Sequence, residues 1–240
     1  MTENTLSSEM KQKLEKVSVA TLATALFKRG LRHQVIQDVR PIVAKGRNMV
    51  GPAFTLRYMP AREDRNQLIE FRNPKHPQRH AVETCPPGHI LVMDSRKCAN
   101  AASAGDILVN RLMVRGVAGV VTDGGLRDAM KIGELEIPAY HNRPSSPTNL
   151  TTNEAIDINV PIGCGDAPVF PGDILVGDDD SVIVIPANLV EEVANEAVEM
   201  TAYEDFVLKK VQAGASLIGL YPATDKANVA EFEASRKNSD

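Results

Sequence analysis

The sequence predicts an α/β fold. Two short apolar runs, 89–94 and 117–123, are bounded by turn residues and are typical of buried strands. Between them, residues 108–116 carry apolar side chains at helical spacing and end at Gly116, a residue type that often ends helices. A strand, a helix and a second strand in this order favour a parallel pair of strands.

Length and composition indicate one folded domain, residues 1–240. Of the 240 residues, 43% are hydrophobic and 24% are charged, as in ordinary globular proteins. The net charge of −4 and the scattered basic residues argue against a nucleic-acid partner. The three cysteines lack paired spacing, so we expect a reducing compartment without disulfides or a zinc site. No apolar run reaches the length of a signal core or membrane span, so we expect a cytoplasmic protein without a membrane partner.

The first quarter of the chain predicts two helices and a strand. Residues 7–16 form a polar helix capped by Ser7 or Ser8. Ser18 caps a second helix that ends at Gly30. Its apolar stripe, which we assign to the core or to a subunit contact, consists of Val19, Leu22, Ala23, Leu26 and Phe27. Residues 48–59 alternate in polarity and predict a strand.

The segment from Pro60 to Arg79 is rich in charge, proline and asparagine and predicts a long irregular loop. It is either a functional loop over a site or a mobile, solvated one. If it is functional, its candidate residues are Arg57, Arg62, Glu63 and Asp64.

The remaining chain alternates short predicted elements with turns. In order, they are a helix 127–134, a strand 138–141, a loop 143–153, a strand 155–160, a turn-rich connection 161–171, a hairpin 171–186 and a helix 187–213. Three aspartates, 178–180, lie in the hairpin turn, and their spacing fits a solvated turn better than a calcium loop. The tail from Ser216 either frays or packs on a neighbour.

The stretch 118–128 predicts the active centre. An apolar strand runs into Gly124 and Gly125 and then into Arg127 and Asp128. Ligands collect at the carboxyl ends of strands in α/β sheets. Arg127 offers a planar fork for a carboxylate, and Asp128 offers oxygens for Mg²⁺ or Mn²⁺. The alternatives are an exposed ion pair of little consequence, or Asp128 as a helix cap.

A second feature lies at the junction Gly105–Leu108, where small residues lead into a helix. Unpaired backbone amides and the helix dipole make such a junction an anion site. Together with Arg127 and Asp128, it predicts a receptor for a small carboxylate beside a metal. Such a site suits the enolate of a 2-oxo acid such as pyruvate.

These residues resemble the RraA-like family. The similar motifs are Gly105–Leu108, residues 115–121, Asp123-Gly124 and Arg127-Asp128, and the resemblance extends from about Ser18 to Pro186. It implies a β/α/β sandwich related to swivelling phosphohistidine domains, with a C-terminal helix and tail over residues 187–240. It also implies homotrimers or homohexamers whose sites lie at subunit interfaces.

The resemblance implies a role for each site residue. The amides of Gly105, Asp106, Ile107 and Leu108 bind the substrate carboxylate; Arg127 holds the oxo acid and the developing enolate; Asp128 ligates the metal. Asp106 contacts water on that metal. A further acidic residue is expected from a neighbouring chain, with Glu231 and Glu233 as candidates.

The implied activity is that of a divalent-metal-dependent lyase. It would cleave a 4-hydroxy-2-oxo acid to pyruvate and a second oxo compound, with oxaloacetate decarboxylation as a side activity. The alternatives are a non-enzymatic regulator that binds and inhibits a ribonuclease, and a sugar-acid hydratase or hydrolase with the same metal site. The segment 60–79 and the tail after Tyr221 differ from shorter family members and are expected to alter the pocket rim, which leaves the substrate open.

Overall fold

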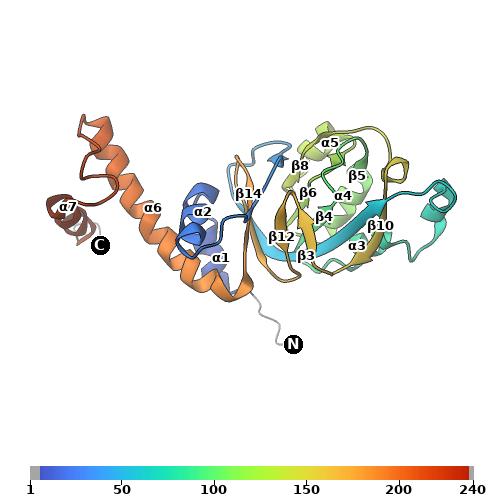
Figure 1. Ribbon diagram of the computed structural model, residues 1–240, viewed down its shortest axis with the longest axis horizontal. Coiled ribbons are helices and arrows are strands. Elements are labelled where there is room, and N and C mark those ends of the chain that lie inside the picture. Colours follow the sequence, from blue (N-terminus) through green and yellow to red (C-terminus); the bar gives the residue numbers. More distant parts are fainter. Residues whose placement is uncertain (1–5, 238–240) are drawn as a thin grey trace.

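The computed structural model describes residues 6–237 as an α/β body and a helical arm (Figure 1). The body holds the sheet. The arm begins in the second half of helix α6 (Val190–Gln212), which leaves the body, and ends with α7 (Lys226–Lys237). We call residues 201–237 the C-terminal arm.

A nine-stranded curled sheet forms the centre of the body, in the order β1-β14-β13-β3-β4-β6-β8-β2, with β10 paired to β3. The bounds are β1 Val35–Ile36, β2 Arg40–Pro41, β3 Met49–Pro60, β4 Ile90–Asp94, β6 Gly119–Thr122, β8 Ala139–His141, β10 Asn153–Ile158, β13 Ile174–Gly177 and β14 Val182–Ile185. Strands β3, β4, β6 and β8 are parallel, and the other pairs are antiparallel. The predicted α/β class, the parallel pair β4–β6 and the hairpin β13–β14 are therefore confirmed.

Strand β3 holds the sheet together because it has three partners. Residues Met49–Pro52 pair with β13, Ala53–Arg57 with β4, and Leu56–Pro60 with β10. Gly119 of β6 lies so close to the start of β3 that a Cβ there would be 2.0 Å from the Met49 sulfur. Only glycine allows these strands this approach.

Two smaller sheets flank the main one. Strands β5 (Ala102–Ala104), β7 (Gly125–Leu126) and β9 (Arg143–Pro144) form a parallel sheet. Strands β11 (Ile162–Cys164) and β12 (Ala167–Val169) form a hairpin. The prediction of an irregular connection over 161–171 is wrong here, because each strand has only three residues and the glycines and prolines obscure the alternation.

Helices α1 (Ser8–Leu14) and α2 (Val19–Lys28) pack with the first half of α6 against β13 and β14. The predicted caps are confirmed: Ser7 accepts from the Met10 amide and Ser18 from the Thr21 amide. Of the two alternatives for the apolar stripe, core or subunit contact, the core does not apply to Phe27. Its side chain is 59% exposed, and the Arg32 guanidinium lies 5.7 Å from its ring centre.

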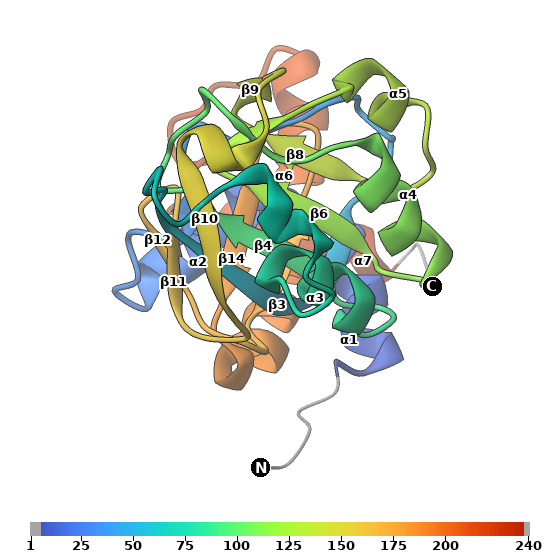
Figure 2. The ribbon, with the colours of Figure 1, turned by 90° about the vertical axis from the view of Figure 1, so that its right-hand side faces the viewer.

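The other face of the sheet is covered by α3 (Pro77–Thr84), α4 (Asp106–Val114) and α5 (Ala129–Gly133) (Figure 2). Short 3₁₀ turns are η1 (Leu68–Arg72), η2 (Asn149–Thr151) and η3 (Ala187–Leu189). The prediction that 60–79 is irregular is wrong for η1 and for the start of α3. Charged residues mask the pattern of α3, which buries only Gln78, Ala81 and Val82.

The buried apolar side chains form three clusters: under α3–α5, under α1, α2 and α6, and inside the curl of the sheet. Within residues 6–237, none of the helices combines the length and apolar character needed to cross a bilayer.

Candidate active site

A cavity of about 540 Å³ opens beside the small sheet β5-β7-β9. Its size is within the usual range for small-molecule sites. It is lined by Leu68, Phe71, Gln78, Arg79, Ala102, Ala104, Gly105, Asp106, Ile107, Leu108, Arg127, Asp128, Thr148 and Asn149. All six residues singled out by the sequence, Gly105–Leu108 and Arg127-Asp128, therefore line one cavity.

Gly105 and Arg127 are brought together by neighbouring strands. Strands β5 and β7 run parallel, and the Arg127 amide donates to the Ala104 carbonyl at 3.1 Å. A Cβ on Gly105 would lie 2.7 Å from Arg127 Cγ. The Arg127 side chain thus lies across the glycine at the start of α4.

At the start of α4, two of the four amides that were predicted to bind a carboxylate already have hydrogen-bond partners. The Ile107 amide donates to the Asp106 carboxylate at 2.9 Å, and the Leu108 amide donates to the Gly105 carbonyl at 3.1 Å. A ligand that bound these two amides would have to displace those partners. The helix dipole and the half-buried turn at Gly105 still favour an anion at this position.

Asp128 follows β7 in a left-handed conformation, with φ of 56°. It occupies the N-cap position of α5, but its side chain makes no capping hydrogen bond. Instead, Asp128 Oδ2 accepts from Arg127 Nε at 3.3 Å. The exposed ion pair is therefore present, and its strength in water is small. What distinguishes it is its position in the cavity wall.

Asp106 lies across from this pair at the first position of α4. Its side chain is 23% exposed, and its Oδ2 lies 3.7 Å from Lys131 Nζ of α5. Lys131 itself is 70% exposed. Two carboxylates, those of Asp106 and Asp128, thus share the cavity.

Segment 60–79 forms part of the cavity wall, through residues that were not predicted from the sequence. Leu68, Phe71, Gln78 and Arg79 line the cavity. The candidates Arg57, Arg62, Glu63 and Asp64 do not: Arg57 lies 3.9 Å from Asp157, and Arg62 pairs with Asp64 at 2.6 Å. The available signal in the sequence was the spacing of two residues: Phe71 and Arg79 are eight positions apart, and Arg79 lies two residues after Pro77, where α3 begins.

Asp123, in the turn between β6 and β7, has a structural role. Its buried carboxylate accepts from the amides of Ser95 at 2.7 Å, Lys97 at 3.0 Å and Gly165 at 3.1 Å. Burial raises its pKa above the ordinary value, against the effect of those three amides. Asp123 thus ties two loops behind the site, 95–97 and the turn at Gly165, to the end of β6.

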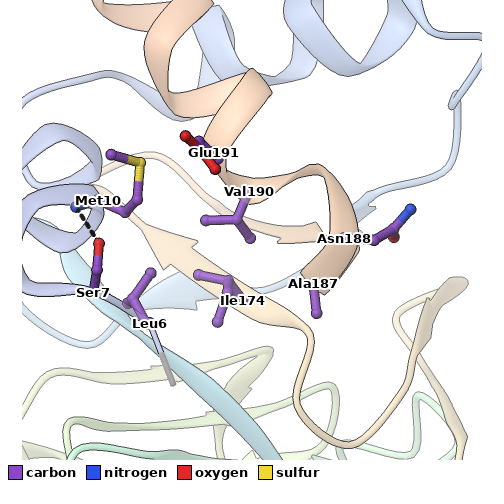
Figure 3. A pocket seen from close by; sticks show the side chains of 8 residues that line it. All are labelled: Leu6, Ser7, Met10, Ile174, Ala187, Asn188, Val190 and Glu191. Atoms are coloured by element: carbon purple, nitrogen blue, oxygen red, sulfur yellow. Dashed lines mark hydrogen bonds between the residues drawn. The ribbon is translucent and has the colours of Figure 1, made fainter. Parts of the chain in front are cut away.

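A smaller cavity offers less chemistry. It has a volume of about 290 Å³ and lies between α1 and the start of α6 (Figure 3). It is lined largely by aliphatic side chains, the Ser7 hydroxyl accepts from Met10, and Glu191 is its one ionisable residue. Within residues 6–237, no three His, Cys, Asp or Glu side chains are grouped closely enough to hold a metal by themselves.

A known protein family matches most of this chain. The model of the RraA-like family, described as Aldolase/RraA, matches residues 19–184, which include every strand of the main sheet except the last residue of β14. The chain belongs to the RraA-like family. The match also contains the whole lining of the cavity.

Individual RraA-like relatives carry two kinds of name. A protein of Halalkalibacterium halodurans, 34% identical over 52% of this chain and 59% of its own length, is named "Putative 4-hydroxy-4-methyl-2-oxoglutarate aldolase". RraAS2 of Streptomyces coelicolor, described as an unusual member of the RNase ES inhibitor RraA protein family, is 28% identical. Its structure matches 84% of this chain and 96% of its own, with a TM-score of 0.74.

Coverage of the curated relatives is incomplete. The matched segments span 59% of the Halalkalibacterium protein and 32% of Protein DlpA of Legionella pneumophila, which is 23% identical.

Proposed function

We propose that this RraA-like protein is a divalent-metal-dependent lyase of the class II aldolase type. It would cleave a 4-hydroxy-2-oxo acid to pyruvate and a second oxo compound. The observation that carries the proposal is the cavity that joins the start of α4, the Arg127 guanidinium and the carboxylates of Asp106 and Asp128. The aldolase name of the Halalkalibacterium relative supports the same reaction class.

The chain's own residues bind and orient the substrate. The Arg127 guanidinium pairs with the C1 carboxylate through its planar edge, and the positive end of the α4 dipole favours the same group. Because Gly105 has no side chain, the carboxylate can approach the backbone closely. These contacts fix the plane of the 2-oxo acid against β5 and β7.

The residues present fit a hard divalent cation such as Mg²⁺ or Mn²⁺. Such ions accept one or two protein carboxylates and complete their shell with water and substrate oxygens, so a three-residue protein cluster is not required. Asp128 would hold the ion, and Asp106 would contact its hydration shell. When bound, the ion would polarise the C2 carbonyl and stabilise enolate charge.

Cleavage removes the proton of the C4 hydroxyl and breaks the C3–C4 bond, and the bonding electrons move to C3 and the C2 oxygen. Asp106 lies in the cavity to receive the hydroxyl proton through water. Arg127 stabilises the negative charge that develops on the oxo acid. Protonation of C3 then gives pyruvate, and the same enolate chemistry would decarboxylate oxaloacetate.

The test is pyruvate release from oxaloacetate and from a 4-hydroxy-2-oxo acid, measured with Mg²⁺ and with EDTA. We expect release that depends on the cation. Absence of pyruvate from both substrates under both conditions contradicts the lyase. Loss of water or hydrolysis without C–C cleavage would assign the site to a hydratase or hydrolase.

A second candidate function is inhibition of a ribonuclease by binding. It is supported by the likeness to RraAS2, which covers most of both chains. A pull-down with an RNase E-type enzyme, followed by an RNA cleavage assay, tests it. Tight binding and inhibition in a protein that releases no pyruvate would favour this function over the lyase.

We also propose that the protein assembles into homotrimers or homohexamers, and that a neighbouring subunit completes the site. Three large apolar side chains on α4 and α5 are exposed, Ile107 (78%), Val114 (73%) and Met130 (81%), and Ile107 also lines the cavity. Exposed apolar patches of this kind mark interaction surfaces. Glu231 and Glu233 lie on α7, far from α4 within one chain (Figure 1), so they would reach a site only in another subunit.

A further inference from the structure

His76, the residue before α3, is a buried histidine whose ring nitrogens are unpaired. The residue is 4% exposed, and within residues 6–237 neither Nδ1 nor Nε2 has a hydrogen-bond partner. Buried polar atoms are nearly always hydrogen-bonded, so an exception calls for an explanation. The ring instead packs edge-on against Phe71, with the two ring centres 5.2 Å apart. Phe71 lines the cavity and His76 does not, so His76 supports this wall from outside the cavity.

The segment that contains His76 is held to the body by few groups. Of residues 61–79, three are buried, and all three are polar: Asn66, His76 and Gln78. Asn66 bonds within the segment, where its Oδ1 accepts from a backbone amide at 2.6 Å. Gln78 bonds to the body, where its Nε2 donates to the Ser103 carbonyl of β5 at 2.5 Å. The segment projects beyond the end of β3, on the side of the body opposite the arm (Figure 1).

The backbone between Arg62 and His76 is also independent of the sheet. In the described part of the chain, the hydrogen bonds that its amides donate end on other residues of the same stretch. Its aliphatic side chains add little burial, since Leu68 is 72% and Ile69 50% exposed. Segments with few buried apolar contacts open locally at a lower free energy than the core. Opening of this one would take Leu68 and Phe71 out of the cavity wall and leave the sheet intact.

A proton on the His76 ring is poorly accommodated in this position. Burial and then the charge of Arg79 lower its pKa below the ordinary value. The carboxylates of Glu154 on β10 and Glu70 on η1 act in the opposite direction, but neither accepts a hydrogen bond from the ring. The charged ring therefore gains stability when it leaves for water, whereas the neutral ring does not.

The other titratable groups on the elements around α3 do not alter this balance near neutral pH. Tyr58 of β3 stays neutral because burial raises its pKa. Glu83 of α3 and Arg111 of α4 pair with each other at 2.8 Å and stay charged. His80 lies four residues further along α3 and is exposed, so opening changes its surroundings little.

We infer that segment 60–79 is an acid-sensitive flap, which the neutral His76 ring holds closed against the cavity and which protonation of that ring releases. The closed form binds fewer protons than the open form, so acid favours opening. The effect begins as pH falls below about 6.5, the ordinary pKa of histidine. The opening itself does not depend on the reaction in the cavity, whereas its consequence for turnover rests on the proposed lyase function.

Hydrogen–deuterium exchange of the full chain measures the opening directly. Peptides within 66–80 are followed at pH 7.5 and pH 5.5, and the rates are corrected for the intrinsic effect of pH on amide exchange. We expect the opening equilibrium constant to rise severalfold, up to the limit of about tenfold that one histidine proton sets over this range. Amides of β4 and β6 report unfolding of the whole fold separately. An unchanged constant overturns the inference, and so does a fall, which would mean that the charged ring recruits a carboxylate such as Glu154.

Two substitutions remove the proton and keep an apolar side chain against Phe71. In His76→Phe and in the smaller His76→Leu, we expect the opening constant to differ by less than about twofold between the two pH values. At pH 7.5 the segment should be protected at least as well as in the wild type, because two unpaired polar atoms are gone. His80→Gln, at an exposed position of the same helix, is the matched control and should keep the wild-type rise. A wild-type rise in the His76 variants, or loss of protection in both at pH 7.5, overturns the inference.

Pyruvate release by the same proteins separates this inference from the lyase. If the wild type releases pyruvate but its opening constant is the same at both pH values, the flap is wrong and the lyase survives. If the opening follows His76 and no pyruvate is released under any condition, the lyase is wrong and the flap remains. If both are right, kcat/KM should fall less between pH 7.5 and pH 5.5 in His76→Phe than in the wild type.

Discussion

At the scale of single residues, the conformation of Asp128 determines where its carboxylate points. A φ of 56° is costly for most residues, whereas Asn and Asp tolerate it. The residue thus reaches the cavity by a backbone turn rather than by a long side chain. A substitution that tests its charge should therefore keep its backbone preference.

We expect Asp128→Asn to abolish metal-stimulated pyruvate release, with a loss of about a hundredfold or more in kcat/KM, and to leave stability nearly unchanged. Asp128→Ala should lose the same activity but also some stability, because alanine adopts this conformation less readily. Steady-state kinetics with Mg²⁺ measures the effect. Asp179→Asn, in the exposed turn between β13 and β14, is the control, and equal losses in both variants would refute the site assignment.

Gly105→Ala tests the contact between the helix start and Arg127. The new Cβ would lie 2.7 Å from Arg127 Cγ and 3.0 Å from Cδ, so the arginine has to move. A shift of this size in a substrate-binding group costs about a hundredfold in kcat/KM. Gly163→Ala, whose Cβ would meet nothing within 4 Å, should be active. Unchanged kinetics in Gly105→Ala would show that Arg127 does not need its observed position.

His141 makes stability depend on pH. Burial lowers its pKa to about 4, and its Nδ1 has no hydrogen-bond partner within residues 6–237. The unfolded chain therefore binds a proton at higher pH than the folded one, and stability falls as pH drops from about 6.5 to 4. The slope is about 1.4 kcal/mol per pH unit for each such proton. Urea unfolding between pH 7 and 4.5 should show a shallower decline for His141→Asn, and an identical decline would contradict the assignment.

These residue-scale features differ in how far the sequence predicts them. Gly105–Leu108, Arg127 and Asp128 are recognisable because they follow apolar strands. Arg79 and Phe71 are not, because their segment has the composition of a solvated loop and only the fold turns them toward the cavity. The bond between the Ile107 amide and Asp106 is likewise a matter of rotamer, which spacing does not determine.

At the scale of secondary structure, Asp123 connects the end of β6 to two other segments, 95–97 and the turn at Gly165, through three backbone amides. Asp123→Ala leaves these buried amides without an acceptor, and we expect a loss of about 3 kcal/mol or more in the free energy of unfolding. Asp157→Ala, on the exposed part of β10, should change it by less than about 0.5 kcal/mol. Equal unfolding midpoints in urea for the two variants would show that the loops are held by other contacts.

Elements with strong local signals are the ones that the sequence predicts. Serine caps mark the starts of α1 and α2, and continuous apolar runs mark β4, β6, β13 and β14. The hairpin β11–β12 and helix α3 were missed because their residues gain their environment from tertiary packing: β11 and β12 pack inside the curl of the sheet, and α3 packs on β3 and β10. Helix propensity over the eight mostly polar residues of α3 does not contain that information.

At the scale of the whole molecule, the C-terminal arm is separate from the core. The three buried clusters include no residue beyond Met200. Within the arm, the rings of Tyr203, Phe206 and Phe232 pack against one another in edge-on and tilted pairs. Exposed Leu217 and Ile218, the latter 92% exposed, lie between α6 and α7. The arm thus presents apolar surface that one chain does not cover.

We expect deletion of residues 213–240 to leave the urea midpoint of the body nearly unchanged and to reduce the assembled mass. The reason is that the arm adds little to the core but carries apolar surface suited to a second copy. Sedimentation velocity of the full and shortened chains measures the effect. Leu217→Ser with Ile218→Ser is a milder version. Equal masses for the full and shortened chains would exclude the arm from assembly.

Because strand β3 has three partner strands, its continuity decides where a circular permutant of this chain can be opened. New termini placed inside Met49–Pro60 would separate the two halves of the sheet that this strand connects through its backbone hydrogen bonds. A circular permutant opened there should therefore not refold. One opened at Glu63-Asp64, two exposed residues just past the strand, would leave every backbone ladder whole.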